Sequence, residues 1–295
     1  MADPGVLLVD KPGGMTSHDV VARARRALGT RKIGHAGTLD PMATGLLVLG
    51  VEGATRLLTY VVGLDKTYEA TVRLGVATDT DDADGEEVSR ADASAVESMA
   101  ILTQVAVLTG RISQVPSTYS AIKVDGRRAY DLARAGEQVE LKAREVTVSR
   151  FDVITERRDG AVVDLDVIVD CSSGTYIRSL ARDLGAALGV GGHLTALRRT
   201  RIGPFSVADA VAADAIADAT LASPADVAVL VLGRLDVTAD EARDLRHGKR
   251  LPGAAERLPA NPAAAIEPGG ALVGVVEKRG ADVKSTMNMP GELAR

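Results

Sequence analysis

Residues 163–183, VDLDVIVDCSSGTYIRSLARD, contain a change of apolar period that defines the class of fold. In the first half, aliphatic side chains alternate with aspartates, the period of two that is typical of a strand with one buried face. From Gly174 to Leu188 the spacing becomes that of an amphipathic helix. A strand-to-helix turn therefore joins the two, and the first helical amides at such a turn can receive an anion.

Tyr176 and Arg178 fall in the first turn of this predicted helix. We expect both side chains to face a cleft. The simpler alternative is a helix capped by the hydroxyl of Ser173 or Thr175, with Tyr176 packed and Arg178 in solvent. The residues alone leave both interpretations open.

The flanking sequence predicts further elements of both kinds. A helix is expected from Ser17 to about Leu28, with Thr16 and Asp19 at its N-terminus and Gly29 as its stop. Two further strands are expected at 46–49 and 67–74, and a helical segment at 52–62. Because strands and helices do not alternate strictly, we expect an α+β fold with a mixed sheet.

The composition changes near residue 230. Alanine and aspartate dominate residues 207–232, which indicates helices or a linker beside the core. The remainder combines short apolar runs with several prolines, which suggests a small β-rich module. The sequence thus predicts a first domain at 1–230 and a second at 231–295.

Cysteine content and hydropathy bear on the compartment. The single cysteine, Cys171, excludes an internal disulfide framework and a Cys-based zinc cluster, and suits a reducing compartment. Residues 1–5 carry no basic region, and apolar runs such as 46–51 fall far below the roughly 18 residues that a spanning helix needs. We expect a cytoplasmic protein without membrane insertion.

The net charge of −5 argues at first against nucleic acid, yet its distribution is uneven. Residues 79–97 hold eight carboxylates and one arginine, while 178–201 hold five arginines and one aspartate. Residues 115–130 interleave tyrosine with basic side chains, the mix used for stacking and phosphate contact. One face could therefore be basic, although a solvated acidic loop and a basic surface hairpin explain the same pattern.

Asp40 lies in the segment richest in small residues, GHAGTLDPMATGLL at 34–47. Such a loop brings backbone close to a ligand and holds a carboxylate at a fixed angle. Taken alone, its Asp-Pro-x-x-Thr-Gly composition is equally that of an ordinary turn. His35 could act as a general base, but with no partner identifiable from spacing a structural or stacking role is at least as good an interpretation.

Motifs for common cofactors and metals do not occur in the sequence. There is no His-Glu-x-x-His, no phosphate-binding loop, no dinucleotide fingerprint and no Gly-x-Ser-x-Gly elbow, and residues 79–86 fail the spacing of a calcium loop. We therefore expect no metal and no cofactor, which leaves Asp40 with little competition as the acting group.

Four blocks in order resemble the TruB family of bacterial tRNA pseudouridine-55 synthases. They are VDKPGGMTS at 9–17, the loop at 34–47, KTYEA at 66–70 and SGTYIR at 173–178. The string GTLDPxATGLL is highly specific, and the resemblance covers roughly residues 5–205.

The resemblance implies a pseudouridine-synthase fold, with a mixed, mainly antiparallel sheet and a central cleft, and a C-terminal RNA-binding domain of the PUA type. It also implies isomerisation of the uridine at position 55 in the tRNA T-loop, by base flipping and without cofactor. A monomer without an obligate protein partner is expected.

The resemblance further implies roles for single residues. Asp40 matches the catalytic aspartate, and Arg178 matches the arginine that pairs with it and would keep it ionised. Residues that match the lining of the uridine site, or that lie near it, are His35, Tyr68, Tyr176, Leu197 and Lys11. Two alternatives stay open: a protein that binds or folds RNA without chemistry, and a synthase for ribosomal RNA.

Overall fold

The computed structural model describes residues 3–119, 123–124, 127–128 and 141–290. These residues form two compact units. The first unit comprises Met1–Asp40, Leu46–Val62 and Gly203–Arg295, and the second comprises Pro41–Gly45 and Gly63–Ile202. The chain passes between the units at four points, and the first of them is the peptide bond that follows Asp40.

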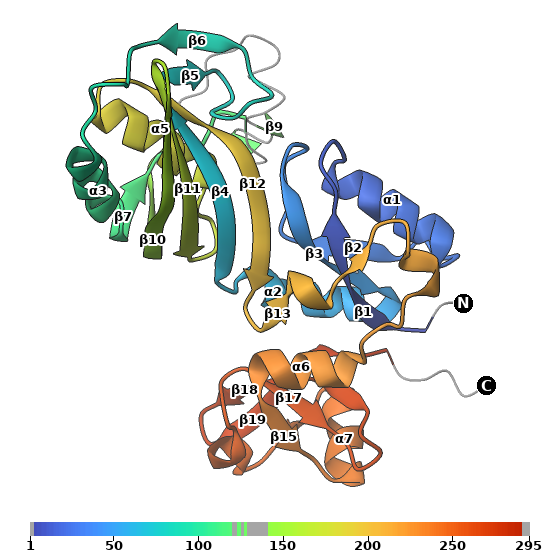
Figure 1. Ribbon diagram of the computed structural model, residues 1–295. Helices are drawn as coiled ribbons and strands as arrows, with labels where there is room; N and C mark the ends of the chain where they lie inside the picture. The colour runs from blue at the N-terminus through green and yellow to red at the C-terminus, as the bar shows by residue number, and fades with distance from the viewer. Residues whose placement is uncertain (1–2, 120–122, 125–126, 129–140, 291–295) are drawn as a thin grey trace. The chain divides into compact units, whose positions relative to one another are not determined.

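The second unit is built on an antiparallel sheet (Figure 1). Its strands lie in the order β12 (Gly192–Ile202), β4 (Lys66–Leu74), β11 (Val162–Cys171), β10 (Arg144–Asp159) and β7 (Gly110–Gln114). The strands predicted at 67–74 and 163–169 are confirmed, and they pair with each other from Val163 opposite Leu74 to Val169 opposite Tyr68. The first two residues of β3 (Thr44–Val51), Thr44 and Gly45, pair in parallel with β12, which makes the sheet mixed.

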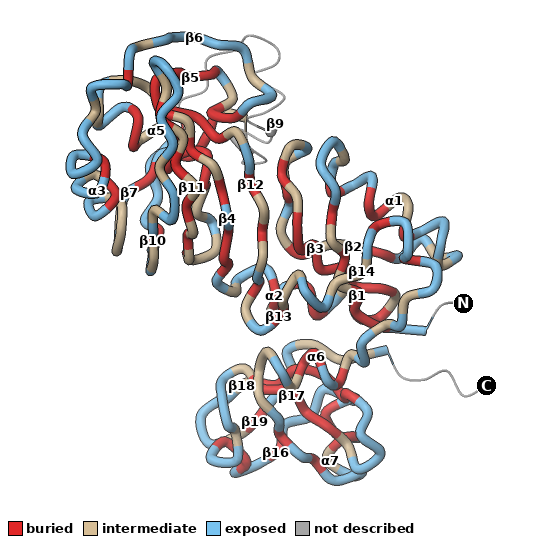
Figure 2. The backbone as a smooth tube through the Cα atoms, in the orientation of Figure 1, coloured by how far each residue is buried: buried red, intermediate tan, exposed pale blue. Residues whose placement is uncertain are grey.

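The alternation of β11 separates two faces of this sheet. Val163, Leu165, Val167 and Val169 are buried, as are Ala70, Val72 and Leu74 of β4 (Figure 2). Helix α5 (Ile177–Ala187) packs on β12 and β4, and α3 (Ser98–Val107) packs on β10 and α5. The aspartates of β11 instead pair with arginines of neighbouring strands, as in the bond from Arg73 Nη2 to Asp164 Oδ2 at 2.7 Å. The predicted half-buried strand is therefore correct on both faces.

Helix α5 begins later than its sequence pattern indicates. The prediction started the helix at Gly174, but Gly174 has a φ of +90° and belongs to a turn closed by the N–H of Thr175 and the C=O of Ser172. The N-cap is Tyr176, and no side chain of its own caps the helix. Capping by Ser173 or Thr175, the alternative interpretation of this turn, is therefore wrong.

Two short hairpins complete the second unit. β5 (Val76–Thr78) pairs with β6 (Glu87–Arg90), and β8 (Lys123–Val124) pairs with β9 (Arg127–Arg128). The second hairpin lies in the basic segment predicted at 115–130, of which Tyr130 is outside the described residues.

The N-terminal part of the first unit is a small sheet covered by α1 (Ser17–Ala27). β1 (Gly5–Lys11) pairs in parallel with β14 (Val211–Ala212), and β2 (Ile33–Ala36) pairs with the later residues of β3. Thr16 and Asp19 form a capping box at the start of α1, as the sequence predicted. The helical segment predicted at 52–62 is the 3₁₀-helix η1 (Glu52–Leu57) followed by α2 (Leu58–Val62).

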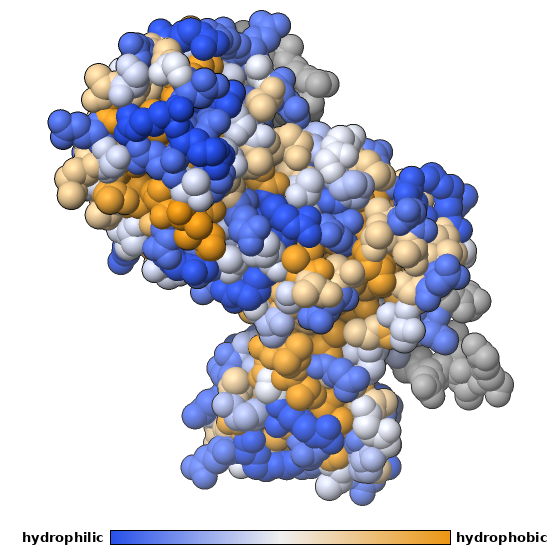
Figure 3. All heavy atoms as spheres, in the orientation of Figure 1, coloured by the Kyte–Doolittle hydropathy of each residue, from blue (hydrophilic) through white to orange (hydrophobic). Residues whose placement is uncertain are grey.

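The C-terminal part of the first unit is rich in β structure, as predicted. It is preceded by β13 (Phe205–Ser206), η2 (Val207–Asp209), η3 (Ile216–Asp218) and α6 (Pro224–Leu232). Its sheet has the order β15 (Arg234–Asp236), β17 (Ala263–Ile266), β18 (Leu272–Arg279), β19 (Asp282–Asn288) and β16 (Arg250–Leu251). With α7 (Ala239–Arg246) and η4 (Ala254–Arg257) it encloses its own apolar core. On the face seen in Figure 3, hydrophilic and hydrophobic residues are mixed over the surface of this part.

None of the helices in the described part of the chain is both long enough and apolar enough to cross a membrane.

Gly45 offers a test of the pairing between β3 and β12. Its φ is +100°, and a Cβ there would overlap the backbone of Arg199. We expect Gly45→Ala to lower the free energy of unfolding by about 3 kcal/mol or more in urea titrations. Gly29→Ala is the control, because Gly29 also has a positive φ of +64° but nothing near its Cβ, and its cost should be about 1 kcal/mol. Equal losses in the two variants would contradict the close approach of the strands.

Candidate active site

The loop that carries Asp40 is fixed by a buried hydroxyl. Ser17 is 1% exposed, and its Oγ accepts a hydrogen bond from the N–H of Leu39 at 2.8 Å and donates one to the C=O of Leu39 at 3.1 Å. Leu39 is itself buried, whereas Asp40 is half-buried. Both backbone groups of the residue before Asp40 are thus held, while Asp40 itself is only partly buried.

Ser17 is in turn placed by the turn that precedes α1. Lys11 is fully buried, and its Nζ donates to the C=O of Pro12 at 2.9 Å and to that of Met15 at 2.6 Å. The capping box then starts the helix, and Ser17 is its first residue. Lys11, which the resemblance places near the cleft, therefore shapes the turn that leads to Ser17, whose hydroxyl holds the backbone of Leu39.

His35 lies on β2, opposite Leu49 of β3. Its ring meets that of His18 edge to face, with centroids 5.5 Å apart and an interplanar angle of 84°. The stacking interpretation of His35 thus has a partner in the structure, and this partner comes from α1, the same helix that holds Leu39 through Ser17.

Tyr68 lies on β4 in the second unit, and its side chain is buried. It is directly opposite Val169 of β11 and Arg199 of β12.

Lys66 lies two residues before Tyr68 on the same face of β4. It is also buried, and it pairs across the sheet with Cys171. Burial, helped by the nearby charge of Arg199, lowers the pKa of Lys66 from 10.5 to about 8. Burial likewise raises the pKa of the Cys171 thiol to about 11.

Tyr176 is held through its backbone. Its N–H donates to Oε1 of Gln114 at 2.9 Å, and its C=O accepts from Nε2 of Gln114 at 3.0 Å. Gln114 is the last residue of β7 and is 2% exposed. The side chain of Tyr176 is half-buried, so that its backbone is locked while part of the residue stays accessible.

Arg178 is buried, with 4% of its surface exposed, so the alternative that placed it in solvent is wrong. Its Nη1 donates to the C=O of Thr80 at 2.8 Å, and its Nη2 to the C=O of Tyr119 at 2.7 Å. Asp82 Oδ2 lies 3.5 Å from Nη1, which gives the guanidinium a buried counter-ion. Arg178 thus ties α5 to the acidic loop and to the start of the basic segment.

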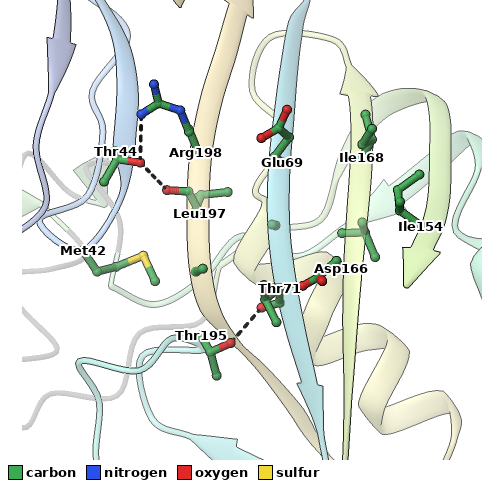
Figure 4. Close-up of a pocket in the computed structure, with 13 residues that line it drawn as sticks. Met42, Thr44, Glu69, Thr71, Ile154, Asp166, Ile168, Thr195, Leu197 and Arg198 are labelled. Carbon is green, nitrogen blue, oxygen red and sulfur yellow. Dashed lines mark hydrogen bonds between the residues drawn. The ribbon is translucent and has the colours of Figure 1, made fainter. Parts of the chain in front are cut away.

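Leu197 lies on β12 beside a cavity of about 610 Å³ on the sheet (Figure 4). Its C=O accepts a hydrogen bond from Thr44 Oγ1 at 3.4 Å, and Nη1 of Arg198 lies 3.5 Å from the same hydroxyl. The other residues lining the cavity are Met42, Glu69, Ala70, Thr71, Ile154, Asp166, Val167, Ile168, Thr195 and Ala196. Met42 and Thr44 belong to the loop that follows Asp40, so this loop also shapes the second unit.

The predicted site residues divide between the two units. Lys11, His35 and Asp40 belong to the first unit, and Tyr68, Tyr176, Arg178 and Leu197 to the second. The pairing of Arg178 with Asp40 stays a prediction.

Sequence reasoning missed the side chains that position these residues: Ser17, Asp82 and Gln114. Ser17 was interpreted only as part of a helix start, and Asp82 only as part of an acidic loop. Gln114, 62 residues before Tyr176 in the chain, gave no local signal.

Comparison with protein families assigns residues 25–290 of the chain. Residues 25–177 match the N-terminal domain of TruB family pseudouridylate synthases. Residues 178–232 match the C-terminal domain of tRNA pseudouridylate synthase B, and 232–290 match the C-terminal domain of tRNA pseudouridine synthase II. The chain belongs to the TruB family of pseudouridylate synthases, enzymes that isomerise uridine in RNA.

Full-length relatives agree with this assignment. The tRNA pseudouridine synthase B of Leifsonia xyli subsp. xyli is 56% identical, over 99% of this chain and 98% of its own length. That of an Arthrobacter species is 54% identical, over 96% and 95%. Among solved structures, a Cbf5-Nop10-Gar1 complex matches with a TM-score of 0.68 at 26% identity, over 92% of this chain and 78% of the other. An H/ACA RNP bound to a substrate RNA has the same fold, with a TM-score of 0.70 at 24% identity, over 97% and 85%.

The two hydrogen bonds between Ser17 and the backbone of Leu39 predict an effect on catalysis. Ser17→Ala leaves a buried N–H and C=O without this partner, so we expect stability to fall by about 1–3 kcal/mol. Because Asp40 is adjacent, we also expect turnover on RNA to fall by about 10- to 100-fold, with little change in RNA affinity.

Thr16→Ala is the matched control for this substitution. It removes the helix cap, at a cost of about 1 kcal/mol, without touching Leu39. Turnover should stay near wild type in this variant. If both variants lost turnover equally, Ser17 would act on the helix and not on Asp40.

Lys66 predicts a dependence of stability on pH. Below about pH 8 the amine is charged in both states, and burial of that charge destabilises the fold. Between about pH 8 and 10.5 the folded state has lost the proton that the unfolded state keeps, so stability from this group rises with pH. The free energy of unfolding of Lys66→Met, relative to that of wild type, should therefore be highest at pH 7 and should decrease towards pH 10. If the difference in unfolding free energy between the variant and wild type, measured by urea titration, did not change from pH 7 to pH 10, the lowered pKa of Lys66 would be contradicted.

Proposed function

We propose that this chain isomerises the uridine at position 55 in the T-loop of tRNA, and that Asp40 is the essential group. The observation that carries the proposal is the loop at 34–47, in which the backbone beside the half-buried Asp40 is fixed by the buried hydroxyl of Ser17. The full-length relatives bear the name tRNA pseudouridine synthase B, which supports tRNA as the substrate.

The chemistry of the reaction suits a single carboxylate. The bond from ribose C1′ to N1 of uracil breaks, the base rotates, and a bond from C1′ to C5 forms. C5 loses its proton and N1 gains one, so that no electrons are exchanged with another molecule. Asp40 can serve as a nucleophile or as a base in this sequence, and either role requires that it be ionised.

The remaining site residues bind and orient the base in this proposal. A uridine in a folded loop must be flipped out of its stack, at a cost of a few kcal/mol. Tyr68 supplies an aromatic face for the flipped base, and Tyr176 and Leu197 supply walls. Arg178 pairs with Asp40 and keeps it charged. Lys11 and His35 are the further residues that the resemblance assigns to the site or near it.

We extend the proposal to the organisation of the molecule. Residues 1–230 form the catalytic domain, and residues 231–295 form an RNA-binding domain of the PUA type. The T-stem-loop of tRNA is the partner, the protein acts as a monomer in the cytoplasm, and no second protein is required. We further propose that Arg198 and Arg201 of β12, which are half-buried and exposed respectively, contact phosphate.

Asp40→Asn tests the proposed function. The variant keeps the shape of the side chain but loses its negative charge, so we expect no pseudouridine formation. Affinity for tRNA should stay within a few-fold of wild type, because Asp40 adds no attractive contact to phosphate. Tritium release from tRNA labelled at C5 of uracil measures the reaction, and filter binding measures the affinity.

The same assay separates the competing substrates. Release from a tRNA transcript with uridine at position 55, and none from one with cytidine there, would support the T-loop assignment. Release from ribosomal RNA fragments at an equal rate would contradict it. Turnover surviving in Asp40→Asn would remove Asp40 from the chemistry, and tRNA binding without release by the wild type would indicate a binding protein.

A further inference from the structure

Residues 114–119, which begin with the last residue of β7, make several hydrogen bonds to the first turns of α5. Besides the amide of Gln114 on Tyr176, the C=O of Val115 accepts from Arg182 Nη2 at 2.7 Å. The C=O of Tyr119 accepts from Arg178 Nη2 at 2.7 Å. The first residue of this segment therefore holds the backbone at the helix start, and the later ones hold side chains further along the helix.

Gln114 differs from the other contacts because it controls a backbone. A primary amide offers a donor and an acceptor in one plane, so it can satisfy the N–H and the C=O of the same residue. Tyr176 needs this support, since it is the N-cap of α5 and has no side-chain cap of its own. Its φ of −103° and ψ of 110° are extended, and they turn the chain from β11 into the helix.

We propose that Gln114 is a positioning residue for the isomerisation, which sets Tyr176 against the uridine through the backbone of that tyrosine. The inference rests on the proposed function, in which Tyr176 forms a wall of the uridine site. Gln114 reaches no substrate itself, because it is buried. Its effect is to hold Cα of Tyr176, and hence the ring, in one place. A displacement of about 1 Å at such a residue can cost about 100-fold in rate.

Two substitutions separate this role from simple packing. Gln114→Leu keeps the volume but removes both hydrogen bonds. Gln114→Glu keeps the shape, and as a carboxylate it can accept from the N–H of Tyr176 but cannot donate to its C=O. When protonated, the same side chain donates again. Ser113→Ala is the control, because Ser113 lies on the same strand and is exposed.

The experiment measures the single-turnover rate of pseudouridine formation in tRNA, tRNA affinity and Tm for all four proteins at pH 5.5, 7 and 8.5. We expect Gln114→Leu to lose about 100-fold in rate, with affinity within a few-fold of wild type. The rate of Gln114→Glu relative to wild type should be low at pH 8.5 and recover at pH 5.5. Ser113→Ala should match wild type throughout.

Two results would overturn this role. One is a wild-type rate in Gln114→Leu. The other is a loss that follows Tm and affinity together, with no recovery of Gln114→Glu at low pH, since that is the behaviour of a packing residue. A wild-type protein that forms no pseudouridine in any RNA would overturn the proposed function and this role together, whereas an active wild type with an unaffected Gln114→Leu overturns the role alone.

Discussion

A carboxylate can act on a base at one fixed angle only if the backbone beside it is held still, and here the Ser17 hydroxyl provides that constraint. It occupies both backbone groups of Leu39 and so anchors the loop to α1. α1 depends in turn on its capping box and on the turn around Lys11. The first unit therefore uses the start of a helix to fix the backbone of the residue before Asp40.

The second unit uses the same physical device with different chemistry. Gln114 occupies both backbone groups of Tyr176, as Ser17 does for Leu39. In both cases a buried polar side chain satisfies a buried N–H and C=O at once, which avoids the cost of unpaired polar groups. In each case the side chain that holds the backbone is distant in sequence from the residue that it holds.

The sequence predicted most of the helices and strands and the family, but not the buried side chains, Ser17 and Gln114, that hold the backbone of Leu39 and Tyr176. Period-two alternation located β4 and β11 because each buries one face, and capping chemistry located α1 because Thr16 and Asp19 are three residues apart. The start of α5 was placed too early, since amphipathic spacing does not reveal that Gly174 adopts a positive φ. Ser17 and Gln114 act on residues 22 and 62 positions away, and no local pattern encodes such contacts. The roles of Tyr68, Leu197 and Arg178 towards Asp40 come from the resemblance and stay predictions.

The pairing of β1 with β14 has a consequence for how the chain is made. β1 is synthesised before the second unit, yet one of its two neighbouring strands is β14 at Val211–Ala212, and the core around Leu7 and Val9 also includes Ala213 and Ile216. The antiparallel sheet of the second unit is complete by Ile202. When that sheet has just been synthesised, β1 can pair with β3 but still lacks its other neighbour, β14. Domains generally fold from the N-terminus during synthesis, but the core on which α1 packs can be completed only after residues 211–216, which follow the second unit, have been made.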